Sequence, residues 1–105
     1  MKSFDFNKNV IERSKSVPVI VEFSFPGCGP CVWMEKMLVD IVRQSQGKYE
    51  FVSLPINDFP DAQKAFDLTS NPTTIVFVNG KAKAQLKGAL PKIVIQQWLN
   101  DHAVM

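Results

Sequence analysis

The hydrophobic residues of this chain change their spacing several times, and each change predicts an element of secondary structure. A nearly continuous apolar run at 17–25 is typical of a central parallel strand that is covered on both faces. From Cys31 to about Gln46 the apolar side chains recur at helical spacing, and Gly47 ends the pattern. The two patterns together predict a buried strand that leads directly into a long amphipathic helix.

The rest of the chain predicts shorter elements in the order of a βαβ unit followed by a ββα unit. The expected elements are a short helix at about 7–15, a strand at 49–56, a short helix at 60–68, strands at 73–78 and 81–87, and a helix from about 91 to 102. Asn79-Gly80 supplies the positive φ angles that a two-residue hairpin turn needs. No repeat or linker interrupts this order, so one α/β domain over residues 1–105 is expected.

Composition and charge restrict the classes of function. The 105 residues are 46% hydrophobic, which suits one compact core. The formal net charge is only +2, so neither a nucleic acid nor a membrane surface is expected as a partner. No apolar run has the length of a membrane span, and residues 1–9 lack the features of a signal peptide, so a cytoplasmic protein is expected.

The only two cysteines stand in Cys28-Gly29-Pro30-Cys31, where the predicted strand turns into the predicted helix. The N–H groups and dipole of a helix start stabilise a thiolate, and Cys31 is close enough to attack a mixed disulfide formed at Cys28. The alternatives are a structural disulfide and a metal or iron–sulfur site shared across a dimer. A structural zinc site needs about four ligands, and the single histidine, His102, is far along the chain. We therefore expect a redox pair, with no metal and no other cofactor.

Several motifs together resemble the thioredoxin family from about Phe6 to the C-terminus. They are residues 18–31, Asn71-Pro72-Thr73, Asn79-Gly80 and Lys87-Gly88-Ala89. The resemblance implies a thioredoxin fold, which is an α/β fold with a central mixed β-sheet and helices on both faces. Thioredoxins usually begin with an edge strand, but only residues 2–5 remain for it here, so this strand is expected to be short or absent.

The resemblance further implies a thiol–disulfide oxidoreductase that reduces protein disulfides by dithiol–disulfide exchange. Cys28 would be the nucleophile, Cys31 would resolve the mixed disulfide, and an upstream disulfide reductase would restore the dithiol. A monomer with a role in electron transport and cell redox homeostasis is expected. Two alternatives stay open: a dedicated electron donor to one partner enzyme, and a non-enzymatic docking module on the same fold.

Glu22 is unusual because it stands inside a run that is expected to be buried. By resemblance it takes the place of a buried aspartate behind the second cysteine, where it would accept the proton of Cys31. The lysine that usually accompanies this acid is missing, since its place falls at about Ser53 or Leu54. The other interpretation is a glutamate whose carboxylate reaches water.

The resemblance also implies a substrate-binding platform around the nucleophile. Its residues are Gly27, Gly29, Pro30, Asn71, Pro72, Gly88 and Ala89. Pro72 is expected in the cis form, beside backbone that pairs with an extended substrate segment; the alternative is an ordinary turn proline. Gly27 stands where thioredoxins usually present tryptophan, and Asn71 replaces a branched apolar residue. Ser24 replaces an aromatic residue and Val32 a basic one, so the docking surface is expected to differ while the chemistry is kept.

Overall fold

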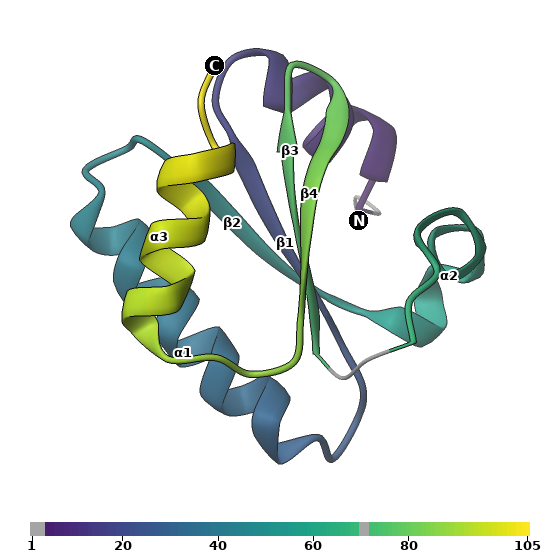
Figure 1. Ribbon diagram of the computed structural model, residues 1–105. Coiled ribbons are helices and arrows are strands. Elements are labelled where there is room, and N and C mark those ends of the chain that lie inside the picture. Colours follow the sequence, from purple (N-terminus) through teal and green to yellow (C-terminus); the bar gives the residue numbers. More distant parts are fainter. Residues whose placement is uncertain (1–3, 70–71) are drawn as a thin grey trace.

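The computed structural model describes residues 4–69 and 72–105, and a mixed β-sheet forms its centre (Figure 1). The strands are β1 (Val19–Ser24), β2 (Glu50–Pro55), β3 (Thr73–Val78) and β4 (Lys81–Lys87). Among the described residues their order in the sheet is β2-β1-β3-β4. β1 runs parallel to β2 and antiparallel to β3, and β3 runs antiparallel to β4. The predicted mixed sheet is confirmed.

Helices cover both faces of the sheet, as the sequence predicts. On one face lie α1 (Gly29–Gln44) and α3 (Lys92–His102), to the left in Figure 1. The other face is covered by α2 (Pro60–Phe66) and by the short helical segments η1 (Asn7–Glu12), η2 (Arg13–Lys15) and η3 (Ile56–Asp58). No helix in the described part of the chain is long and apolar enough to cross a membrane.

The sheet separates two hydrophobic cores. The core beneath α1 and α3 includes Ile20, Val76, Met34, Leu38, Ile95 and Leu99. The core on the opposite face includes Val21, Phe23, Phe77, Val10 and Ala62. β1 and β3 contribute to both cores, because alternate residues of a strand point to opposite faces. This explains why both strands are buried along nearly their whole length.

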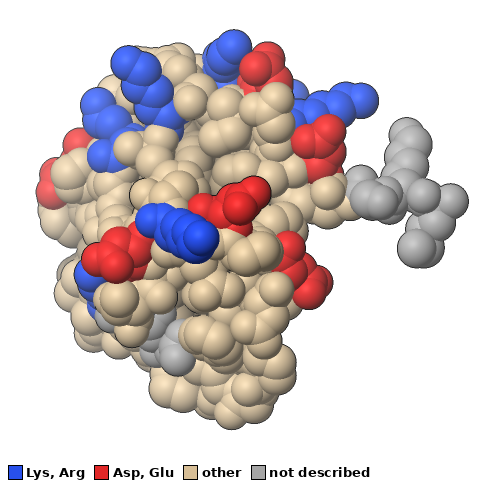
Figure 2. All heavy atoms as spheres, turned by 90° about the vertical axis from the view of Figure 1, so that its right-hand side faces the viewer, with Lys and Arg blue, Asp and Glu red and all other residues tan. Residues whose placement is uncertain are grey.

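Among the described residues, the charged side chains lie outside the buried interior, with Glu22 as the exception. Figure 2 shows both basic and acidic side chains on the face that lies to the right in Figure 1. β4 is an edge strand, and its lysines, Lys81, Lys83 and Lys87, are exposed. Lysines on an edge strand discourage pairing with another chain.

The other edge of the sheet is formed by β2. The sequence predicts that the first edge strand is short or absent; residues 1–3 lie outside the described residues, and from Phe4 onward no strand precedes β1. Pro55 is the last residue of β2, where a proline is tolerated because the strand is at an edge. Arg13 of η2 forms an ion pair with Glu50 at the start of this strand.

The β3–β4 hairpin turns at Asn79 and Gly80, whose φ angles are 55° and 83°. These positive values confirm the turn that the Asn-Gly pair predicts. Ser14 of η2 holds the turn from outside the hairpin. Its backbone O accepts a hydrogen bond from Asn79 N at 2.8 Å, and its Oγ accepts one from Gly80 N at 2.8 Å.

The strand register brings three chain segments to one end of the sheet. Phe23 pairs with Thr73, and Thr73 pairs with Lys87. The residues that follow β1, precede β3 and follow β4 therefore meet at this end, where Gly88 N donates a hydrogen bond to Pro72 O at 2.8 Å. β1 runs parallel to β2, and α1 follows it at this end. In open α/β sheets the binding and catalytic sites lie at the carboxyl ends of the parallel strands, so a site is expected here.

Candidate active site

Cys28 and Cys31 form a disulfide at the start of α1. Their sulfur atoms are 2.13 Å apart, and their Cα atoms are 5.2 Å apart, which lies within the usual range for a disulfide. The spacing within the motif therefore brings the two sulfurs together as predicted. The described state is the oxidised form of the pair.

The side chain of Cys28 caps α1. Cys28 precedes the first helical residue and has an extended backbone, and its Sγ accepts a hydrogen bond from Cys31 N at 3.1 Å. In most helices an oxygen of serine, threonine, aspartate or asparagine has this role. A sulfur in the capping position receives the free N–H groups and the positive end of the helix dipole, which favour its thiolate form.

The two cysteines differ in their access to solvent. Cys28 is partly exposed, whereas Cys31 is buried, with 3% of its surface exposed. Cys31 and Pro30 both lie in the first turn of α1. A bulky disulfide substrate can therefore reach Cys28 more readily than Cys31.

A tight turn connects β1 to Cys28. Cys28 N donates a hydrogen bond to Phe25 O at 3.3 Å, and Gly27 has a φ angle of +72°. A positive φ at the third residue, with proline before it, is typical of a type II turn. Sequence reasoning treated Gly27 only as a missing tryptophan, although the Pro26-Gly27 pair is itself a turn signal. Gly27 is thus explained first by its backbone, since a side chain would be strained at this angle.

Glu22 lies in the middle of β1 with none of its surface exposed. Neither carboxyl oxygen has a hydrogen-bond partner among the described residues. The register places Glu22 between Ser53 of β2 and Thr74 of β3, so neither strand neighbour is a lysine. Burial raises the pKa of Glu22 to about 8, and the negative charge of Glu35 adds to the effect. The interpretation in which this carboxylate reaches water does not describe the structure.

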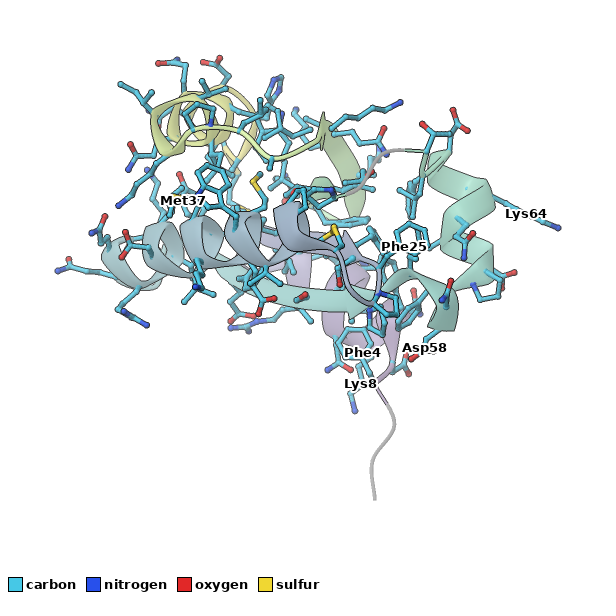
Figure 3. All side chains as sticks on the ribbon, turned by 90° about the horizontal axis from the view of Figure 1, so that it is seen from below. Phe4, Lys8, Phe25, Met37, Asp58 and Lys64 are labelled. Atoms are coloured by element: carbon cyan, nitrogen blue, oxygen red, sulfur yellow. A yellow bond between two sulfur atoms is a disulfide. The ribbon has the colours of Figure 1, made fainter. Side chains whose placement is uncertain are left out.

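A hollow of about 340 Å³ lies beside the disulfide. It is lined by Ser24, Phe25, Gly27, Cys28, Gly29, Cys31, Val32 and Glu35. In Figure 3, which looks onto this end of the sheet, Phe25 lies between the start of α1 and α2. Sequence reasoning placed the cysteines and both glycines at the site but missed Glu35. Its position four residues after Cys31 was the available signal, because such residues lie on the same side of a helix.

Pro72, Gly88 and Ala89 of the predicted platform lie at the same end of the sheet, outside this lining. Pro72 is buried and pairs through its carbonyl with Gly88, whose φ angle is +87°. Ala89 is partly buried and packs against the core beneath α1 and α3. The cis form of Pro72 stays a prediction, and Asn71 lies outside the described residues.

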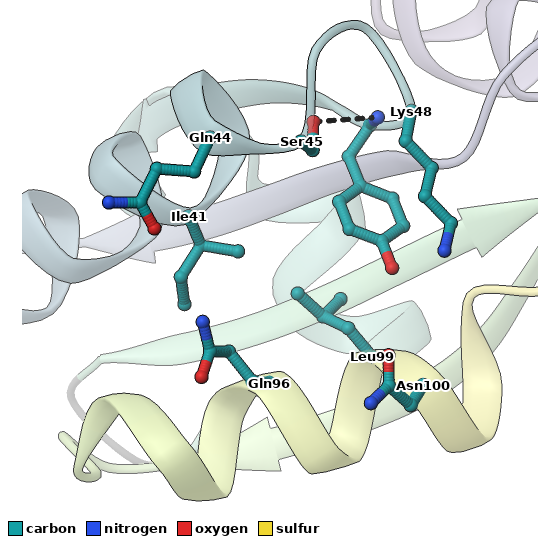
Figure 4. Close-up of a pocket in the computed structure, with 8 residues that line it drawn as sticks. Ile41, Gln44, Ser45, Lys48, Gln96, Leu99 and Asn100 are labelled. Carbon is teal, nitrogen blue, oxygen red and sulfur yellow. Dashed lines mark hydrogen bonds between the residues drawn. The ribbon is translucent and has the colours of Figure 1, made fainter.

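A second hollow, of about 400 Å³, lies far from the cysteines, between the end of α1 and α3 (Figure 4). It is lined by Ile41, Gln44, Ser45, Lys48, Tyr49, Gln96, Leu99 and Asn100. This hollow contains neither a thiol nor a buried acid, so the chemistry of the chain points to the site at the disulfide. In the described ranges, no three His, Cys, Asp or Glu side chains are grouped so as to hold a metal ion.

Comparisons with known proteins agree with this geometry. The family model described as Thioredoxin matches residues 1–101. Thioredoxin 1 of a Nostoc species is 31% identical over 97 residues, which cover 92% of this chain and 89% of the relative. Thioredoxin of Haemophilus influenzae is 30% identical over 98 residues, which cover 93% and 90%. An M-type chloroplastic thioredoxin of Chlamydomonas reinhardtii is 37% identical over 98 residues, which cover 93% of this chain and 69% of the relative.

Proposed function

This chain belongs to the thioredoxin family and is a thiol–disulfide oxidoreductase, and we propose that it reduces protein disulfides with Cys28 as nucleophile and Cys31 as resolving thiol. One observation carries this assignment of roles. Cys28 is partly exposed and its sulfur accepts a hydrogen bond from Cys31 N at the start of α1, while Cys31 itself is buried. The capped, accessible sulfur is the better thiolate and the better nucleophile.

In the first step, the Cys28 thiolate attacks one sulfur of a substrate disulfide. The substrate S–S bond breaks, a mixed disulfide forms at Cys28, and the other substrate sulfur leaves as a thiolate that takes up a proton. The negative charge that moves along the three sulfurs stays near the first turn of α1, where the helix dipole stabilises it.

In the second step, Cys31 resolves the mixed disulfide. Glu22 accepts the Cys31 proton, the Cys31 thiolate attacks the Cys28 sulfur and breaks the mixed disulfide, and the second substrate sulfur leaves as a thiolate that takes up a proton. Glu22 suits this role because burial raises its pKa to about 8, close to the ordinary pKa of a thiol near 8.5. A buried acid with matched pKa exchanges a proton with a thiol at little cost in free energy.

The product is the oxidised pair seen in the structure. It needs two electrons and two protons to return to the dithiol, and we assign this step to an upstream disulfide reductase. A reducing compartment such as the cytoplasm suits this direction of exchange. The protein acts as a monomer in this proposal, because both cysteines and the acid belong to the same chain.

Reduction of insulin disulfides by the protein, with dithiothreitol as the electron source, tests the function. The wild type is expected to reduce insulin faster than dithiothreitol alone, and Cys28→Ser to lose this activity. Cys31→Ser is expected to accumulate a mixed disulfide with substrate proteins, because the first step proceeds without the second. Accumulation of that adduct by Cys28→Ser instead would reverse the roles, and a wild type without activity would leave the docking module as the better hypothesis.

A further inference from the structure

We propose that the hollow beside the disulfide is a subsite for a lysine or arginine side chain of the substrate protein, with the Glu35 carboxylate as its partner. The proposal rests on the proposed function, because the substrate must place its disulfide at Cys28 for a neighbouring side chain to enter the hollow. It specifies which protein disulfides the site prefers: those with a basic residue close to the attacked cysteine.

The lining of the hollow fits a basic side chain. Glu35 is the one charged residue among the eight that line it. Phe25 and Val32 supply apolar contact for the methylene stem of a lysine or arginine, whose charged end can then reach a carboxylate. Ser24 adds a hydroxyl that can accept a hydrogen bond from the ammonium or guanidinium group.

The open part of the hollow faces the position of the substrate. An ideal Cβ placed on Gly27 or Gly29 would meet no atom within 4 Å, so the space above both residues is free. These glycines flank Cys28 on each side. A substrate side chain beside the attacked sulfur therefore enters the hollow without displacing a side chain of this protein.

Glu35 is available to an incoming cation. It is exposed and makes no ion pair or hydrogen bond with any other residue that the structure describes. Lys36 follows Glu35 along α1. Both residues, together with Asp40 and Arg43, line a separate depression on the surface of α1. Lys36 makes no ion pair with Glu35, since successive helical residues point about 100° apart. Asp40 instead pairs with Lys92 of α3.

A cation at Glu35 also acts on the chemistry. The charge of Glu35 opposes the ionised form of Glu22. A lysine or arginine beside Glu35 offsets this negative charge, which favours the ionised Glu22 that accepts the Cys31 proton. Recognition of a basic substrate therefore assists the second step at the same time as it strengthens docking.

Two disulfide peptides test the proposal. They differ only in the residues that flank one cysteine, which are lysine in one peptide and glutamate in the other. For each, kcat/KM is measured with the reduced full chain at low and at high salt. We expect the wild type to prefer the lysine peptide about twofold to fivefold at low salt, the effect of one exposed ion pair. High salt screens exposed charges and is expected to weaken the preference.

Variants separate a local carboxylate from general charge. Glu35→Gln is expected to lose the preference and Glu35→Lys to reverse it. Asp101→Asn, which removes an exposed carboxylate on α3, changes the net charge as Glu35→Gln does and is expected to keep the preference. Equal rates for the two peptides in the wild type, or an unchanged preference in Glu35→Lys, overturn the subsite while leaving the reductase intact. A wild type that reduces neither peptide overturns the proposed function and the subsite together.

Discussion

Replacing Glu22 with glutamine is expected to remove a pH-dependent loss of stability. The folded protein holds this carboxyl in β1 without exposure and without a hydrogen-bond partner among the described residues. Its ionised form is therefore disfavoured in the folded state. Glutamine has nearly the same shape as protonated glutamate and carries no charge at any pH.

The size of the effect follows from the pKa of Glu22, which folding raises from 4.5 to about 8. Between these values the unfolded chain releases a proton that the folded chain keeps, so the free energy of unfolding falls as pH rises. Below pH 4.5 both states are protonated and the loss is absent. Each pH unit inside the window is worth about 1.4 kcal/mol, which gives on the order of 2 to 3 kcal/mol between about pH 5 and about pH 7.

Urea denaturation of the oxidised protein at several pH values measures this quantity. Near pH 5 the wild type and Glu22→Gln are expected to have similar free energies of unfolding. Near pH 7 the variant is expected to be more stable by on the order of 2 kcal/mol. The same substitution is expected to slow release of the mixed disulfide, since the proton acceptor for Cys31 is lost.

The control for Glu22→Gln is the removal of a carboxylate that is exposed in the folded protein. Asp101→Asn at the exposed end of α3 is expected to leave the pH profile of the wild type unchanged. If the free energies of unfolding of the wild type and Glu22→Gln changed in parallel between about pH 5 and about pH 7, the reasoning would be refuted. Such a result would mean that Glu22 has the same pKa in the folded and unfolded states. A full turnover rate in the variant would refute the role as proton acceptor separately.

Three further outcomes are expected from other parts of the structure. Brief treatment of the reduced protein with iodoacetamide at neutral pH should alkylate Cys28 before its buried partner, as mass mapping can show; the reverse order would contradict the assigned roles. Asp40→Asn should lower the urea midpoint at neutral pH, because a hydrogen bond and charge from Lys92 lower the pKa of Asp40 below 3.8. This stabilisation is present above pH 3.8 and disappears as pH falls through the folded pKa, so equal midpoints at neutral pH would count against the ion pair. Gly27→Ala should reduce stability by about 1 to 2 kcal/mol because its φ is +72°, whereas Gly29→Ala, with no positive φ and no close neighbour, should not; similar midpoints for the two variants would exclude the strain.

Local patterns predicted the elements of the fold well, and their ends less well. The hairpin at Asn79 and Gly80 was predictable because the two residues alone determine the turn. α1 was expected from Cys31 and begins at Gly29, because a sulfur caps it and Pro30 suits its first turn. It ends at Gln44 and not near Gln46, since Gln46 and the following glycine both have positive φ.

The site was predictable where a short motif defines it and not where tertiary packing does. Cys28 and Cys31 belong to one helix start, so their spacing in the sequence was sufficient. Glu35 belongs to the site because its helix turns it toward the hollow and toward Glu22, which lies on a different element. The burial of Glu22 likewise depends on α1 lying over the sheet. The apolar run around Glu22 indicated its burial, and the spacing after Cys31 indicated the side of the helix on which Glu35 lies, but neither pattern shows that the two acids act on each other.

The two hydrogen bonds that Ser14 accepts from the β3–β4 turn have a consequence for the order of folding. Ser14 and Gly80 are 66 positions apart in the sequence. During synthesis the segment before β1 emerges first, and the turn that donates these hydrogen bonds emerges much later, after β3. A nascent chain that stops short of Asn79 cannot form either of these two hydrogen bonds. Closing so long a loop is slow, so docking of the segment is expected to follow, and not to nucleate, assembly of the sheet.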